Sequence, residues 1–114
     1  WWKECVLDNE LDFAKTSGSH PKEIISTQDL LDLHDKHIAQ AIKILTEVDE
    51  KEFDNLWTMR SGEHKFFTLP KGQVARTWCL NHWYHHRGQL TVYLRLLNVP
   101  LPATYATTAD LEGK

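Results

Sequence analysis

The chain has 114 residues, 25% of them charged, and a formal net charge of −3, which is the size and composition of one ordinary globular domain. Its 13 basic residues against 16 acidic ones argue against a nucleic-acid binder that relies on a basic surface. No apolar run reaches the roughly 18 residues that a membrane-spanning helix needs. Two cysteines are too few for a secreted fold held by several disulfides. We therefore expect a cytoplasmic protein without nucleic-acid or membrane partners.

Hydrophobic periodicity predicts helices in the first half of the chain. Residues 1–9 have the pattern of the end of a helix. Residues 26–48 form an amphipathic helix, because Ser26 is a suitable cap and Asp29 stands three residues later. Its apolar stripe recurs at three-and-four spacing and consists of Leu31, His34, Ile38, Ala41, Leu45 and Val48.

The second half of the chain predicts a small hairpin followed by a long helix. Residues 57–59 and 66–68 are β-forming and flank a segment that contains Gly62, which indicates a hairpin or an extended loop. A helix begins near Pro70, with Thr68 as a possible cap, and ends near Asn98. Long helices with short connections favour an all-α bundle in a single domain over residues 1–114.

The most informative segment is residues 81–89, which holds three of the seven histidines. His82 and His86 are four residues apart, so on a helix they point the same way, about one turn from each other. That spacing suits two imidazoles that bind one divalent cation. Both lie on the stripe expected to face the core, where unpartnered imidazoles would be costly. The alternative interpretation is a pair of packing histidines without a metal.

The neighbours of this pair have other expected roles. His85 lies about 100° around the helix from His86 and points to a flank or to solvent. Arg87 is expected in a surface or interface ion pair. Gly88 lowers the stability of a helix relative to alanine, so we expect it where another backbone approaches closely. Gln89, three residues after His86, can hydrogen bond near the site.

The remaining candidate ligands have less distinctive surroundings. His34 and His37 lie on the predicted helix over 26–48 and are able to approach the last helix, although ordinary helix-surface roles fit both better. His20 and His64 fall in predicted loops, where we expect them to be solvated. Cys79 precedes His82 by one turn and is interpreted as a small core residue, since no charged neighbour marks it as a nucleophile.

The segment around the two histidines resembles the last helix of the DinB/YfiT-like family of damage-inducible proteins. The similarity rests on His82, His86 and the Arg-Gly-Gln-Leu run at 87–90, followed by Leu-Arg-Leu-Leu-Asn-Val-Pro at 94–100. The family includes thiol-dependent transferases and proteins regarded as metal-dependent hydrolases. The resemblance implies an up-and-down four-helix bundle, often a homodimer, that binds a divalent metal such as Zn, Ni or Fe through three histidines. By the resemblance, His82 and His86 are two of these ligands.

The resemblance also implies that the chain is an N-terminally incomplete DinB-like domain. Trp1-Trp2 resembles the end of the family's second helix, which places the first helix and the third ligand upstream. We therefore expect an all-α fold of three helices of the bundle, with a small loop or hairpin between the last two. The third ligand lies upstream of Trp1, comes from a partner chain, or is His34 or His37; these alternatives stay open.

Two functional hypotheses follow. The first is a metal-dependent hydrolase or a thiol-dependent S-transferase that acts on a small molecule, with a low-molecular-weight thiol as a possible substrate. No catalytic residue is assigned, because Asp54 and Glu63 are candidate bases only by their position in nearby loops, and no organic cofactor is expected. The second is a non-catalytic helical dimerisation module whose histidine pair is vestigial or structural.

Overall fold

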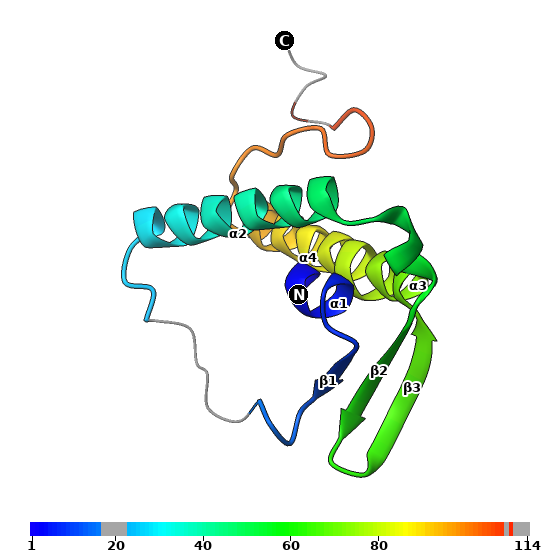
Figure 1. Cartoon of the computed structure of the whole chain (residues 1–114). Helices are drawn as coiled ribbons and strands as arrows, with labels where there is room; N and C mark the ends of the chain where they lie inside the picture. The colour runs from blue at the N-terminus through cyan, green and yellow to red at the C-terminus, as the bar shows by residue number, and fades with distance from the viewer. Residues whose placement is uncertain (17–22, 109, 111–114) are drawn as a thin grey trace. The chain divides into compact units, whose positions relative to one another are not determined.

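The computed structural model describes residues 1–16, 23–108 and 110 (Figure 1). The chain forms two compact units, Trp1–Cys79 and Leu80–Lys114. Within the described ranges, every helix lacks either the length or the apolar character needed to cross a membrane.

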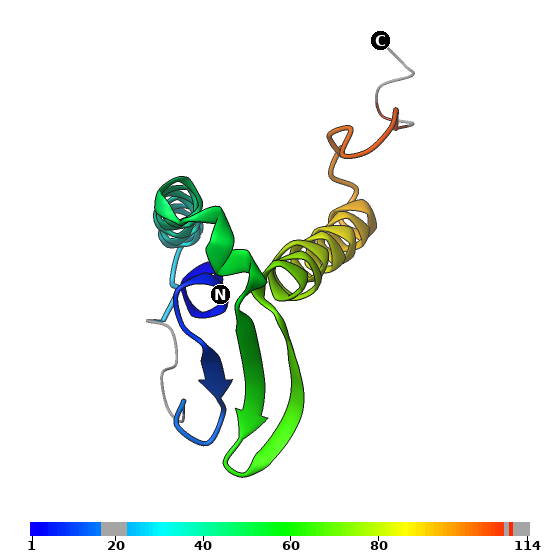
Figure 2. The same ribbon diagram turned by 45° about the vertical axis from the view of Figure 1, so that its right-hand side comes forward.

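The first unit contains a three-stranded mixed sheet in the order β1-β2-β3 (Figure 2). Strand β1 (Glu10–Asp12) runs parallel to β2 (Leu56–Ser61), and β2 runs antiparallel to β3 (His64–Pro70). The expectation of an all-α four-helix-bundle type is therefore wrong. The missed element is β1, which precedes the first long helix and pairs with β2 from far along the sequence.

The hairpin of β2 and β3 follows from local sequence. In β2, Trp57 and Met59 are buried and alternate with more exposed neighbours, as the two-residue period of a strand requires. Gly62 turns the chain with a φ of 58°, a conformation that glycine adopts without steric cost. The hairpin expected around Gly62 is confirmed.

Side-chain hydrogen bonds of Asp12 attach β1 to this hairpin. One carboxylate oxygen of the buried Asp12 accepts from the backbone N–H of Gly62 at 2.9 Å and from that of Ala14 at 3.0 Å. Arg60 lies 3.4 Å from the other oxygen. The Gly62 N–H contributes most to lowering the pKa of Asp12 below its ordinary value. A charged acceptor thus fixes a short strand whose own sequence has little preference for strand structure.

The bounds of helix α2 (Thr27–Glu47) agree with the sequence prediction, whereas Leu31, His34 and Leu45 of the predicted apolar stripe are exposed. The Ser26 hydroxyl accepts from the backbone N–H of Asp29 at 3.1 Å, and the Asp29 carboxylate accepts from the Ser26 N–H at 2.9 Å. This reciprocal capping satisfies donors that a helix start otherwise leaves unpaired. Ala41 and Ile44 are its buried residues. The 3-10 helix η1 (Glu50–Asp54) follows.

Helix α1 (Trp2–Val6) confirms the predicted helical segment near the start of the sequence. Two side chains from distant parts of the chain bind its carbonyl groups. Trp57 Nε1 donates to the Glu4 carbonyl at 2.8 Å, and the Nζ of Lys71, which is 1% exposed, donates to the Val6 carbonyl at 2.9 Å. These bonds satisfy carbonyls that have no partner within so short a helix. Beneath them lies the core cluster of Cys5, Trp57, Met59, Val74 and Cys79.

The helical region after β3 has three parts. Helix α3 (Lys71–Val74) leads into the π-helix η2 (Ala75–Asn81), and helix α4 (His82–Leu96) follows. The predicted end near Asn98 is confirmed, since Asn98 adopts a left-handed φ of 57° as asparagine does after helix ends.

The predicted start of this helical region is shifted by the sheet. Pro70 is the last residue of β3 and precedes α3 directly. Thr68 is a strand residue rather than a cap, and its hydroxyl hydrogen bonds to the Thr58 hydroxyl at 2.9 Å across the hairpin. The proline therefore marks the change from strand to helix.

In the second unit, an ion pair joins α4 to the segment that follows it. Arg95 donates to both carboxylate oxygens of Asp110 at 2.9 and 2.7 Å, and the Leu101 N–H donates to the same carboxylate at 3.0 Å. The bonds from Arg95 are the main cause that lowers the pKa of Asp110 to about 2. A two-point guanidinium contact of this kind fixes both direction and distance.

Candidate metal centre

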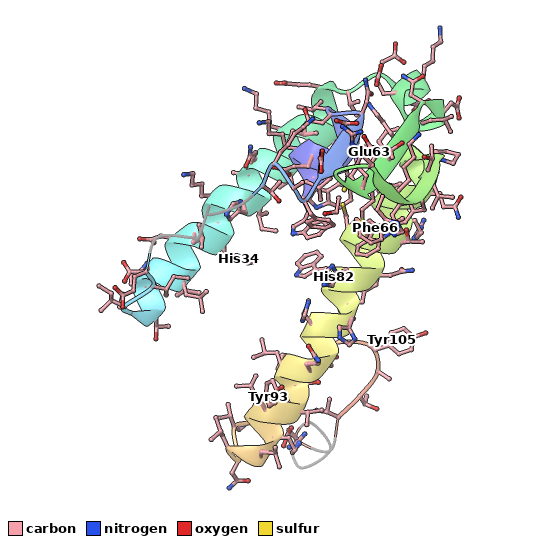
Figure 3. All side chains as sticks on the ribbon, turned by 90° about the horizontal axis from the view of Figure 1, so that it is seen from below. His34, Glu63, Phe66, His82, Tyr93 and Tyr105 are labelled. Atoms are coloured by element: carbon pink, nitrogen blue, oxygen red, sulfur yellow. The ribbon has the colours of Figure 1, made fainter. Side chains whose placement is uncertain are left out.

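His82 and His86 occupy the first turns of α4, where Figure 3 labels His82. Their Nε2 atoms are 2.8 Å apart, and the ring centroids are 4.6 Å apart. His82 is half-buried and His86 is exposed, so the pair is more open than the expected core position would make it. The four-residue spacing has nevertheless brought the two ring nitrogens within hydrogen-bond distance of each other.

Gln89 orients the second ring of the pair. Its Oε1 lies 2.8 Å from Nδ1 of His86. An amide oxygen only accepts, so Nδ1 carries the proton and donates, and Nε2 of the neutral His86 ring presents its lone pair toward His82. The expectation that Gln89 hydrogen bonds near the site is confirmed. Histidines that bind metals are commonly held through their second nitrogen in this way.

The spacing of the two Nε2 atoms fits two adjacent positions around a divalent ion. Metal–nitrogen bonds of about 2.0–2.1 Å place two nitrogens about 2.8–3.0 Å apart at a right angle, and about 3.3–3.4 Å apart at a tetrahedral angle. The observed 2.8 Å matches the first arrangement, and a small ring rotation reaches the second. Among the described residues, His, Cys, Asp and Glu form no group of three or more that could hold a metal.

The other histidines have separate surroundings. His34 is exposed on α2 with its Nδ1 3.1 Å from an Asp35 carboxylate oxygen, and His37 is also exposed. His64 is exposed and meets the Phe66 ring edge-on at 4.9 Å. His20, expected to be solvated, lies outside the described residues. The role of His34 or His37 as the third ligand stays a prediction.

The residues that flank the pair partly depart from expectation. His85 is exposed, as expected. The Arg87 guanidinium lies 5.2 Å from the Tyr84 ring centroid, a cation–π contact on the helix surface rather than the expected ion pair. A Cβ added to Gly88 would meet no heavy atom of the described residues within 4 Å. The backbone approach expected at Gly88 is therefore not formed by the described part of the chain.

The candidate bases and Cys79 belong to the first unit. Asp54 ends η1, Glu63 lies in the β2–β3 turn, and both are exposed. Cys79 is buried in the core cluster, as predicted, but it hydrogen bonds to Cys5, which the sequence interpretation did not single out. No local pattern joins two cysteines that are so far apart in the sequence.

Comparison with known proteins identifies the family. The model of the DinB family matches residues 9–112, a range that includes His82, His86 and Gln89. Searches of curated proteins and of solved structures gave no match. The family assignment drawn from the residues of the last helix is confirmed, and the single domain over 1–114 stays a prediction.

Proposed function

The chain belongs to the DinB family, and from this membership we propose that it binds a divalent metal and acts on a small molecule as a metal-dependent hydrolase or a thiol-dependent S-transferase. The observation that supports the proposal most is the convergence of His82 Nε2 and His86 Nε2 at 2.8 Å. Two imidazoles at this spacing suit Zn, Ni or Fe, all of which accept histidine ligands.

Each residue of the centre has a defined part in the proposal. His82 and His86 bind the ion through Nε2, while Gln89 keeps Nδ1 of His86 protonated and its ring in place. A divalent ion supplies Lewis-acid activation of water for hydrolysis or of a thiol for transfer. Because only two donors come from α4, further coordination positions are open to substrate, solvent or another protein segment.

The metal content of the purified protein tests the first part. The protein is prepared without a His tag, incubated in turn with Zn, Ni and Fe, desalted and examined by elemental analysis. We expect one equivalent of metal in the wild type and loss of that metal in His82→Ala and His86→Ala. His85→Ala is the matched control, because it removes a neighbouring exposed imidazole and should retain the metal. A wild type that retains none of these metals would overturn the proposal.

Two substrate sets separate the reaction classes. Chromogenic esters and phosphoesters report hydrolysis, and a low-molecular-weight thiol with an aromatic halide reports S-transfer. We expect turnover in one set that a chelator abolishes, that the retained metal restores, and that His82→Ala lacks. Turnover that survives both the chelator and His82→Ala would contradict a metal-dependent reaction.

A second candidate function, self-association as a helical dimerisation module, is favoured by the surface of α4. The helix has no buried residue, and its exposed large apolar side chains include Trp83, Leu90, Tyr93 and Leu96. Extended apolar surfaces of this kind mark interaction sites. Sedimentation should give a dimer for the wild type and for His85→Glu, and a monomer for Leu90→Glu. A monomeric wild type would exclude this function.

A further inference from the structure

Cys5 and Cys79 bring two thiols together in the core of the first unit. Cys5 is 0% exposed on α1, and Cys79 is 7% exposed on η2. Both belong to the same buried cluster, and their side chains hydrogen bond to one another. They are also the two cysteines of the sequence. Two helical segments from opposite ends of this unit are thus joined by a pair of free thiols.

The two thiols are chemically unequal. The hydrogen bond between them raises the pKa of Cys5, with burial as the second cause, and lowers the pKa of Cys79. This direction is expected when the Cys5 S–H donates to the Cys79 sulfur, because the bond stabilises a thiolate at Cys79 and keeps the proton on Cys5. A thiolate is the reactive form of cysteine. Cys79 is therefore suited to attack, and Cys5 to resolve the product.

The backbone around Cys79 is unusual as well. Cys79 lies within η2, a π-helical segment that covers Ala75–Asn81. Such segments are rare and are frequently found at functional sites. Cys79 is also the less completely buried residue of the two. Geometry and backbone thus distinguish the same residue as the initial reactant.

We propose that Cys5 and Cys79 are a redox-active dithiol that hydrogen peroxide converts to an intramolecular disulfide. The Cys79 thiolate attacks one peroxide oxygen, the O–O bond breaks, and the departing hydroxide takes a proton to form water, which leaves a sulfenic acid on Cys79. The Cys5 sulfur then attacks the Cys79 sulfur, the S–O bond breaks, and the Cys5 proton leaves with the hydroxide as a second water. The two sulfurs are oxidised by two electrons and the peroxide is reduced by two.

The proposal does not depend on metal binding, so it is tested on metal-free protein. Native protein is treated with peroxide, quenched and analysed as intact mass and as tryptic peptides. We expect both thiols to disappear together, with a mass loss of two hydrogen atoms and a linked pair of peptides, residues 4–15 with 77–87. The oxidised protein should also melt higher by on the order of 10 °C, because the bond closes a long loop. Loss of a single thiol, a disulfide-linked dimer, or protection of both thiols until the protein is unfolded would overturn the proposal.

Variants assign the order of the two sulfurs. Cys5→Ser should stop at a sulfenic acid on Cys79 that dimedone traps, whereas Cys79→Ser should leave Cys5 unreacted under the same treatment. Met59→Leu is the matched control, since it removes another buried sulfur of the same cluster and should still give the disulfide. A sulfenic acid trapped on Cys5 in Cys79→Ser would contradict the assigned order. The wild-type peptide result stands on its own if a serine variant does not fold.

Discussion

Gln89 is the residue whose substitution tests the metal centre most selectively. Its Oε1 accepts the Nδ1 proton of His86 at 2.8 Å, so Gln89→Leu removes the acceptor at similar volume and leaves both metal-binding nitrogens in place. Loss of such a supporting contact typically weakens metal binding by 10–100-fold, about 1.4–2.7 kcal/mol. His86 and Gln89 are exposed, and water can replace the lost acceptor in part. We therefore expect a value near the lower limit, about tenfold.

The measurement is a competition titration against a chromophoric chelator with the metal that the wild type retains. Gln89→Glu is the matched variant, because a carboxylate accepts the same proton more strongly and should keep or increase the affinity. Circular dichroism establishes that each variant is folded. An unchanged affinity in Gln89→Leu, together with loss of binding in His86→Ala, would refute the positioning role of Gln89 while leaving the histidine ligands intact.

Two further predictions concern contacts that hold the two units in shape. Lys71→Met should lower the free energy of unfolding, measured by urea titration, by about 2–4 kcal/mol. Most of this loss comes from the buried Val6 carbonyl, which loses a charged donor, and the ion pair with the partly exposed Glu52 contributes less. An unchanged urea midpoint of unfolding would contradict this. Arg95 lowers the pKa of Asp110 from 3.8 to about 2. The contribution of this ion pair to the stability of the native state is therefore complete above about pH 4, and it is lost as the pH falls toward 2. Asp110→Asn should release the segment before it to proteolysis at neutral pH, and equal protection in both proteins would count against the contact.

Features that depend on neighbouring residues were accessible to sequence reasoning. Ser26 and Asp29 are three residues apart, and the capping arrangement they predict is formed. Gly62 between two β-forming runs predicted the hairpin, and Asn98 predicted the end of α4; the structure contains both. The four-residue spacing of His82 and His86 likewise sufficed to predict that the rings converge. In each case, the geometry is fixed by a few successive backbone dihedral angles.

Strand β1 shows why the fold class was wrong. Glu10–Asp12 is only three residues long and contains two carboxylates, a composition that strands generally avoid. It is held in parallel register with β2 by contacts such as the hydrogen bond from the Gly62 N–H to Asp12. The contacts that stabilise β1 are therefore made by residues about fifty positions away. For this reason the sequence of β1 itself carries no periodic strand pattern. The local patterns predicted the hairpin within an otherwise helical fold, but not the third strand that pairs with it to make a sheet.

The two cysteines show the same limit in the chemistry of the chain. His82 and His86 were found because one helical turn relates them, whereas Cys5 and Cys79 meet only after α1 and η2 have packed into one core. Considered alone, Cys79 has the features of an inert core residue, and its burial agrees with that interpretation. The reactivity that we propose for it is a property of the pair, because it depends on the neighbouring thiol of Cys5 in the same cluster. Under this proposal Cys79 is a core residue that also reacts, and its contact with a second thiol is what distinguishes it from an inert buried cysteine.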